Sequence, residues 1–159
     1  MSTTANSGLL GPLRGMHEGS VDKAGRVKLS GKMAAHLSGF ELFWITTLDE
    51  RTVRIYPMPE WMETEKMLTS AQGEQAAKAK NLLFLANYYG DEAKIDGSNR
   101  MTIPTTLRKK LGLEDAAVTM WVDRGHVEVL TPQVIEERFT QARSGGGQDL
   151  ADLEAAGMR

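Results

Sequence analysis

Two copies of one short motif, an aspartate followed four residues later by an arginine, stand out in the sequence. Asp22 and Arg26 form the first copy, and Asp96 and Arg100 form the second. An arginine can make paired hydrogen bonds to the edge of a guanine base, or it can hold a phosphate group. A carboxylate faces phosphate unfavourably, so we expect each aspartate to bind backbone N–H groups of its own turn or to orient its arginine.

A salt bridge within each motif is the simpler interpretation, since exposed pairs of this kind are common and contribute little. The charge distribution favours a further role for the arginines. The whole chain has a net charge of −2, but residues 14–36 carry a net charge of +3 and residues 94–110 carry +4. Local potential rather than net charge decides whether a polyanion can dock, although such clusters can also be ordinary solvated faces.

The two motifs occupy equivalent places in an internal repeat. When the segment 20–61 is laid over the segment 94–135, the two align without a gap. Few positions are identical, but the alignment keeps the apolar pattern and the turn residues in register. We therefore expect the chain to contain two copies of one structural unit.

Each copy predicts a tight turn, over residues 22–25 and residues 96–99. Gly25 and Asn99 hold the last position of the two turns. Glycine, and among the other residues especially asparagine, tolerates positive φ, so both suit one turn geometry.

A short strand is expected to follow each turn. In the first copy Arg26 and Lys28 alternate with Val27 and Leu29, and the strand that begins at Arg100 repeats this alternation. Successive side chains of a strand point to opposite faces. One face of each strand is therefore predicted to be polar and basic, and the other is predicted to enter a core.

The remaining elements follow the same repeat. Short helices are predicted over residues 30–37 and 104–111, with Ser30 as a cap and Gly112 as a stop. Each is followed by two strands joined by a tight turn, over residues 40–48 and 53–56, and over residues 118–122 and 127–130. Further helices are predicted over residues 59–89, with a break at Gly73, and over residues 132–143.

Further residues complete a pattern around the two motifs. Arg14 precedes Asp22 by eight residues, and the run from Tyr56 to Trp61 closes the first copy. Ile103-Pro104 begins the short helix of the second copy. This ordered set resembles the MraZ family of AbrB-like proteins, over about residues 13–141. The chain departs from the family pattern in having its lysine one place early, at Lys23, with Ala24 before Gly25, Ser30 in place of a proline, and Asn99 in place of a glycine.

The resemblance implies an α+β, β-rich fold. Two β-turn-α-β-β repeats would form an AbrB-like swapped-hairpin barrel with linking helices. The expected layout is a flexible N-terminal extension over residues 1–12, a first repeat over 13–61, a helical inter-repeat segment over 62–92, a second repeat with its C-terminal helix over 93–143, and a flexible tail over 144–159.

The resemblance also implies a function. Members of the family bind double-stranded DNA with repeated short boxes, assemble as homo-oligomers into rings, and regulate the promoter of a cell-division and cell-wall gene cluster. Carried over to this chain, the DNA-binding residues are Arg26 and Arg100, with Lys23, Lys28 and Arg14 in second place. Asp22, Gly25, Asp96 and Asn99 would structure the two motifs.

An enzyme finds little support in the sequence. The chain has no cysteine, which excludes disulfides and thiolate metal sites. His17, His36 and His126 lie far apart and lack carboxylates at ligand spacing, so no catalytic, metal or cofactor site is expected. The absence of a long apolar run and of a secretory signal leads us to expect a cytoplasmic, nucleoid-associated protein rather than a membrane protein.

The main alternative is a protein–protein assembly or antitoxin-like module with incidental DNA affinity. Its active surface would be the apolar helix predicted over residues 74–89. The paired basic turns favour DNA binding, because a partner-binding module would not need an arginine at both repeat positions.

Overall fold

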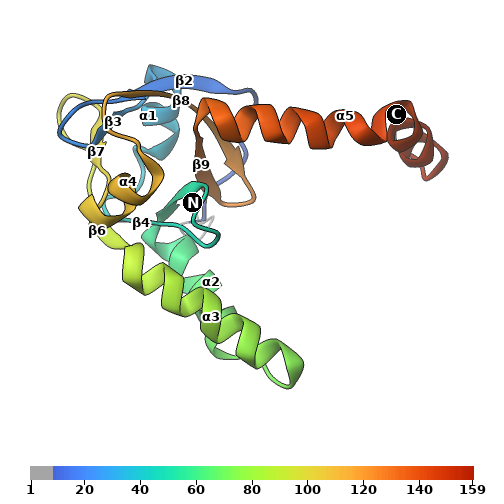
Figure 1. Ribbon diagram of the computed structural model, residues 1–159, viewed down its shortest axis with the longest axis horizontal. Coiled ribbons are helices and arrows are strands. Elements are labelled where there is room, and N and C mark those ends of the chain that lie inside the picture. Colours follow the sequence, from blue (N-terminus) through green and yellow to red (C-terminus); the bar gives the residue numbers. More distant parts are fainter. Residues whose placement is uncertain (1–8) are drawn as a thin grey trace, which may run out of the picture.

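The computed structural model describes residues 9–159 of the chain, drawn in Figure 1. The first repeat contains β2 (His17–Val21), β3 (Arg26–Lys28), α1 (Gly31–Leu37), β4 (Phe43–Thr46), β5 (Val53–Pro57) and α2 (Met58–Thr69). Helix α3 (Glu74–Tyr89) leads to the second repeat. The second repeat contains β6 (Asp91–Ala93), β7 (Arg100–Thr102), α4 (Thr105–Leu111), β8 (Ala116–Asp123), β9 (His126–Leu130) and α5 (Pro132–Ala155).

The strands of this part of the chain form one eight-stranded sheet, in the order β6-β4-β5-β9-β8-β2-β3-β7. Neighbouring strands are antiparallel throughout. The sheet curls into a nearly closed barrel, from which α3 and α5 project in different directions (Figure 1).

The strands of the two repeats are interleaved. β2 pairs with β8, β3 with β7, β4 with β6, and β5 with β9, so each of these pairs joins one repeat to the other. Two equivalent backbone hydrogen bonds also join the two repeats. The Leu29 N–H donates to the Asn99 carbonyl, and the Ile103 N–H donates to the Gly25 carbonyl, both at 2.9 Å. The predicted α+β swapped-hairpin barrel is confirmed.

The repeat seen in the sequence is also present in the element boundaries. In the alignment of the two repeats, the ends of β7 fall on the ends of β3, and the ends of α4 fall on the ends of α1. Helix α2 corresponds in the same way to residues 132–143 of α5. The two halves of the barrel are therefore related by a pseudo-twofold axis.

The alternation predicted for the motif strands is observed. Val27 and Met101, which face each other across β3 and β7, are buried, and Leu29 and Ile103 continue the same buried row. These side chains join a single core with α1, α4 and the inner faces of the other strands. Burying each such side chain contributes about 1.5–3 kcal/mol, which holds the two motif strands against each other.

Local signals fix the ends of the short helices. The Ser30 hydroxyl accepts a hydrogen bond from the Met33 N–H at 3.1 Å and caps α1. Gly112 has a left-handed conformation (φ 63°) and ends α4. Gly73, also at positive φ, separates α2 from α3 as its residue type predicts.

The C-terminal residues differ from the expected flexible tail, because α5 continues through them to Ala155. The helix has a kink at Gly146, whose φ of 45° and ψ of −132° are not helical. Residues 148–155 are rich in alanine, leucine and acidic residues, so the chain resumes a helix after the glycines. Over residues 9–159, no helix combines the length and the apolar character needed to cross a membrane.

Candidate nucleic-acid interface

The Asp22 carboxylate holds the first turn together. Its Oδ1 accepts hydrogen bonds from the backbone N–H groups of Ala24 and Arg26, both at 2.9 Å, and its Oδ2 lies 2.8 Å from Arg26 Nε. The turn closes with a bond from the Gly25 N–H to the Asp22 carbonyl at 3.0 Å, and Gly25 has a φ of 81°.

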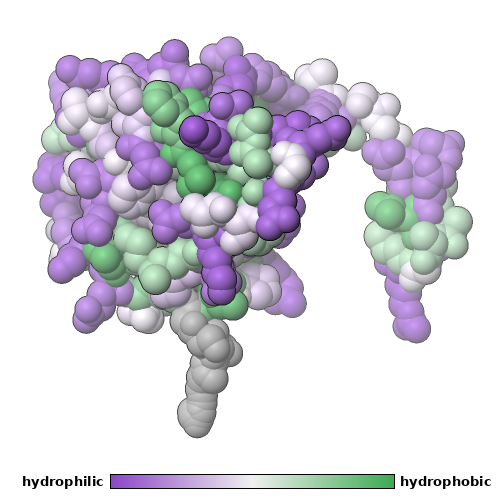
Figure 2. Space-filling view, turned by 90° about the horizontal axis from the view of Figure 1, so that it is seen from below, coloured by the Kyte–Doolittle hydropathy of each residue, from purple (hydrophilic) through white to green (hydrophobic). Residues whose placement is uncertain are grey.

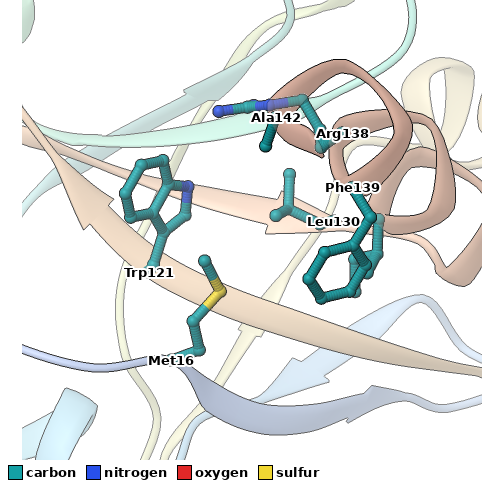
Figure 3. Close-up of a pocket in the computed structure, with 7 residues that line it drawn as sticks. Met16, Trp121, Leu130, Arg138, Phe139 and Ala142 are labelled. Atoms are coloured by element: carbon teal, nitrogen blue, oxygen red, sulfur yellow. The ribbon is translucent and has the colours of Figure 1, made fainter. Parts of the chain in front are cut away.

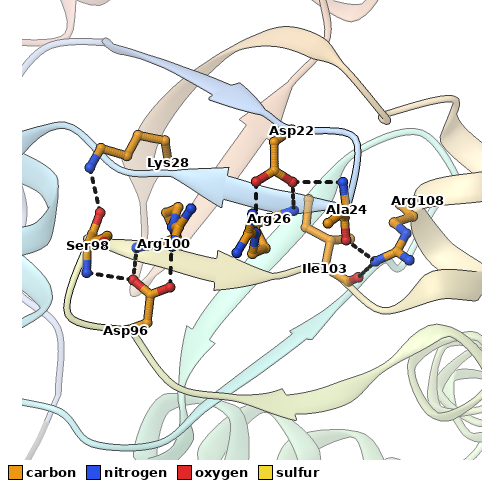
Figure 4. A network of polar contacts seen from close by, with 9 residues as sticks. All are labelled: Asp22, Ala24, Arg26, Lys28, Asp96, Ser98, Arg100, Ile103 and Arg108. Carbon is orange, nitrogen blue, oxygen red and sulfur yellow. Dashed lines mark hydrogen bonds and ion pairs between the residues drawn. The ribbon is translucent and has the colours of Figure 1, made fainter.

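Asp96 makes the same backbone contacts in the second turn. Its Oδ1 accepts hydrogen bonds from the N–H groups of Ser98 (2.8 Å) and Arg100 (3.0 Å), and its Oδ2 lies 3.3 Å from Arg100 Nε. Asn99 has a φ of 59°, and its N–H donates to the Asp96 carbonyl at 3.1 Å. The equivalent turns thus share one pattern of backbone hydrogen bonds (Figure 4). The side-chain contact differs, because Arg26 Nε donates to its aspartate whereas Arg100 Nε makes an ion pair without a hydrogen bond.

These contacts favour the ionised form of both aspartates. A hydrogen bond from the Arg26 backbone is the largest cause that lowers the pKa of Asp22 below its usual value, and the Arg100 backbone does the same for the pKa of Asp96. Each carboxylate can therefore hold its turn and its arginine under the same conditions.

The fold brings the two arginines together on one face. Across β3 and β7, Arg26 lies opposite Thr102 and Lys28 lies opposite Arg100. Because Val27 points into the core, all four of these side chains lie on the outer face of the barrel. Arg26 and Arg100 are diagonal neighbours in this pairing, with Cα atoms about 7–8 Å apart.

The aspartates orient the arginines without covering them. The Arg26 and Arg100 side chains remain 40% and 31% exposed. Each ion pair uses Nε, at the inner end of the guanidinium, so the two terminal amino groups are left to bind another ligand. The arrangement offers two pre-oriented pairs of donors on one surface.

Each turn is also held by a cation from the other repeat. Arg108 Nη1, on α4, donates to the Ala24 carbonyl in the first turn at 2.7 Å. Lys28 Nζ, on β3, donates to the Ser98 carbonyl in the second turn at 2.5 Å. Ala24 and Ser98 are equivalent positions of the repeat, so the two cations brace the same point of each turn (Figure 4).

Arg108 is the residue of this site that the sequence analysis missed. Its guanidinium also bonds the Ile103 carbonyl (3.2 Å) and the Glu114 carboxylate (3.1 Å). A Cβ on Gly25 would lie 2.2 Å from this side chain, so a larger residue there would displace Arg108 from its bond to the turn. Only the tertiary fold places Arg108 at a turn 84 residues away.

The other predicted DNA-binding residues are placed differently. Lys23 is exposed within the first turn, next to Asp22. Lys28 is exposed on the same face as the arginines while its ammonium group braces the second turn. Arg14 lies before β2 and Asp22 directly follows it, so the five residues of this strand, about 16 Å at about 3.3 Å per residue, separate the two. The structure therefore groups four of the five cations and leaves Arg14 at the other end of β2.

A second polar cluster lies on the β8–β9 hairpin, where Asp123, His126 and Glu128 place potential ligand atoms within 4.8 Å of one another. Glu128 Oε2 lies 3.4 Å from His126 Nε2, and Oε1 accepts from Trp121 Nε1 at 2.8 Å. The hydrogen bond with His126 is the largest cause that lowers the pKa of Glu128 to about 2. Arg138 lies 3.5 Å from the same carboxylate, and its positive charge disfavours a cation there.

The sequence is similar to those of named bacterial proteins. The transcriptional regulator MraZ of Acidobacterium capsulatum is 34% identical over 129 residues, which cover 79% of this chain and 86% of that protein. The corresponding protein of Koribacter versatilis is 30% identical over 110 residues, 67% of this chain and 74% of that protein. The chain belongs to the MraZ family. The MraZ protein of Halorhodospira halophila is 32% identical over 111 residues, 66% of this chain and 70% of that protein.

The family assignment from the motifs is thereby confirmed, and it joins the chain to proteins named as transcriptional regulators. No model of a known protein family matches the chain. In this MraZ-family chain the two braced turns place Arg26 and Arg100 together on one exposed face.

Proposed function

We propose that this chain is a transcriptional regulator that binds double-stranded DNA sequence-specifically through the paired turns. The observation that carries the proposal is the meeting of Arg26 and Arg100 on one exposed face, each held at Nε by its own aspartate. The names of its relatives support regulation of transcription. The family resemblance further suggests the promoter of a cell-division and cell-wall gene cluster as its target, and a cytoplasmic, nucleoid-associated location.

The geometry suits a duplex for two reasons. A guanidinium with two free terminal amino groups can donate one hydrogen bond to O6 and one to N7 of the same guanine. Such a contact favours guanine over the wrong base by about 1–3 kcal/mol. The two arginines are related by the pseudo-twofold axis of the barrel, as base pairs are related by the local twofold axes of DNA. Lys23 and Lys28 on the same surface add positive charge that attracts the phosphate backbone.

A binding assay with the full-length protein tests the proposal. The probes are a duplex from the region upstream of its own gene and a duplex of the same length with the sequence shuffled. We expect the upstream duplex to bind at least about 10³-fold more tightly at physiological salt. Equal affinity for the two duplexes would contradict sequence-specific binding.

We further propose that the working unit is a homo-oligomer, in the form of a ring, on DNA that carries several similar boxes. One barrel offers two arginines and few lysines, which leaves its affinity near the non-specific range of roughly 10⁻⁴–10⁻⁶ M. Linked copies can raise avidity by about 10²–10⁴. Boxes spaced by about one helical turn, ~10 bp, would present the same face of the duplex to adjacent subunits.

A protein–protein assembly or antitoxin-like module is the second candidate function. The observation that favours it is an exposed aromatic pair on α3: Phe84 and Tyr88 are 68% and 62% exposed, and their rings stack at 6.3 Å. Heparin chromatography separates the two functions. Strong retention that salt reverses, and that Arg26→Ala reduces, supports the DNA-binding proposal, whereas weak retention unaffected by that substitution supports the module.

A further inference from the structure

An open apolar groove lies between β8 and the first half of α5 (Figure 3). Trp121 and Leu130 form its floor, and Ile135, Phe139 and Ala142 form the wall on α5. Met16, which precedes β2, also lines it. Met16 and Phe139 are 58% and 47% exposed, so a large part of this apolar surface faces solvent.

The internal repeat indicates what shape of partner fits this groove. Leu130 and Ile135 occupy the positions of the second repeat that correspond to Tyr56 and Trp61. In the first repeat those two aromatic residues are buried in a cluster with Ala86 of α3. A hydrogen bond of 2.8 Å from Thr46 Oγ1 to the Ala86 carbonyl also ties α3 to this site. The first repeat therefore covers its groove with a helix, and the second repeat leaves the equivalent groove open.

The chain has a helix that covers nothing in this structure. After the kink at Gly146, residues 148–155 form the end of α5, and every residue from 146 to 159 is exposed. Leu150 and Leu153, three residues apart and so neighbours on one side of the helix, are 52% and 56% exposed. The segment stands apart from the barrel and carries a patch of apolar surface (Figure 2).

Charge complementarity matches this helix to the groove. Arg138 lies over the Trp121 ring at 5.7 Å, and Arg143 lies over the Phe139 ring at 4.8 Å, so two cations border the apolar surface. The helix after the kink carries Asp149, Asp152 and Glu154 around its two leucines. The exposed aromatic face of α3 includes Lys80 instead, which the arginines would repel.

We propose that residues 148–155 of one copy dock into the α5–β8 groove of a second copy. Leu150 and Leu153 cover the groove of the second repeat as Ala86 covers that of the first, and the acidic residues face Arg138 and Arg143. Such a contact is heterologous, with a different surface on each partner, so it links copies head to tail and closes into a ring where the rotation permits. Gly145, Gly146 and Gly147 set the direction in which the helix leaves its own barrel.

The inference rests on the proposed homo-oligomer but not on DNA binding, and a mixing experiment with full-length protein tests it. One variant, Phe139→Gln, damages the groove and keeps the helix. The other, Leu150→Gln with Leu153→Gln, damages the helix and keeps the groove. Glutamine is polar but a good helix former, so both variants are expected to keep α5. Circular dichroism and the fluorescence of the tryptophans verify the fold of each.

Analytical ultracentrifugation over a range of concentrations is the readout. We expect the unaltered chain to associate, and each variant alone to associate at least about tenfold more weakly. Mixed in equal amounts, the two variants should form a one-to-one dimer and nothing larger, because only one intact groove and one intact helix face each other. Phe84→Gln on α3 is the matched control and should associate like the unaltered chain.

Three results would overturn the proposal. The unaltered chain could be monomeric at all concentrations, as it would be if the helix folded back onto its own groove. The mixture of variants could remain monomeric. Phe84→Gln could abolish association while the other variants leave it intact, which would place the contact on α3.

Discussion

The first turn depends on a side chain from the opposite repeat. Arg108 donates to the Ala24 carbonyl, and its other bonds go to Ile103 and Glu114 rather than outward to a ligand. We expect Arg108→Met to weaken specific DNA binding by about three- to tenfold, the scale of one charge-assisted hydrogen bond. The plot of log affinity against log salt should keep its slope, and hydrogen exchange at the Arg26 amide should become faster.

The exposed neighbour Lys109 provides the matched control for that prediction. Lys109→Met removes the same charge from the same helix without touching the turn, so exchange at the Arg26 amide should not change. A salt slope that falls by about one unit in Arg108→Met would show instead that Arg108 contacts phosphate.

Gly25 and Asn99 have the same left-handed backbone but different surroundings. A methyl group on Gly25 would meet the Arg108 side chain at 2.2 Å in addition to the cost of its φ of 81°. We therefore expect Gly25→Ala to destabilise the fold by about 1–3 kcal/mol, and Asn99→Ala by about 1 kcal/mol from backbone strain alone. Urea denaturation of both variants tests this, and equal losses would argue against the steric role of Arg108.

Glu128 links the β8–β9 hairpin to α5 and makes stability depend on pH. Its pKa is about 2 in the folded protein and 4.5 in the unfolded chain, so its contribution is complete above about pH 4.5 and is lost as the pH falls towards 2. That contribution is about 3 kcal/mol. Between pH 5 and pH 2, Glu128→Gln should lose less stability than the unaltered chain, as measured by denaturation at each pH. The exposed residue Glu154 is the control, and Glu154→Gln should keep the full pH dependence.

Among the elements, the end of α5 is the one that the barrel does not use. Residues 146–159 are all exposed, so truncation after Arg143 should leave the thermal unfolding of the barrel unchanged. If the end of α5 links copies, truncation should weaken binding to DNA with several boxes and leave binding to a single box as it was. Equal loss on both kinds of DNA would mean that the segment acts on the DNA-binding surface itself.

Elements with strong local signals could be predicted from the sequence. The alternation around Val27 and the cap at Ser30 placed β3 and α1, and the gapless alignment of the repeats carried both to the second copy. Positive φ at Gly25 and Asn99 followed from the residue types alone.

Other elements depend on contacts that the sequence does not display. β2 and β6 were not predicted as strands: β2 has one fully buried residue, Val21, and β6 is three residues of mostly exposed, acidic chain. Both exist because they pair with strands of the other repeat, β8 and β4. The bracing role of Arg108 is of the same kind. The helix after Gly146 was missed for another reason, since three consecutive glycines suggested a flexible linker.

At the scale of the whole molecule, the pairing of strands from the two repeats creates the candidate site. Neither repeat alone contains two arginines on one face, because β3 and β7 supply one each. The same pairing lets each repeat brace the turn of the other, through Lys28 and Arg108. Folding of the complete barrel and orientation of both arginines are therefore one event.

The central claim is that this pair of arginines reads DNA, and the affinities of Arg26→Ala and Arg100→Ala for the upstream duplex test it most directly. Arg124→Ala is the matched control, since Arg124 is an exposed arginine paired with an aspartate on the β8–β9 hairpin, outside the two turns. We expect each turn variant to lose about 1–3 kcal/mol on the upstream duplex and much less on a shuffled one, with the control unchanged. Unchanged affinity of both turn variants, with the fold intact, would contradict the account.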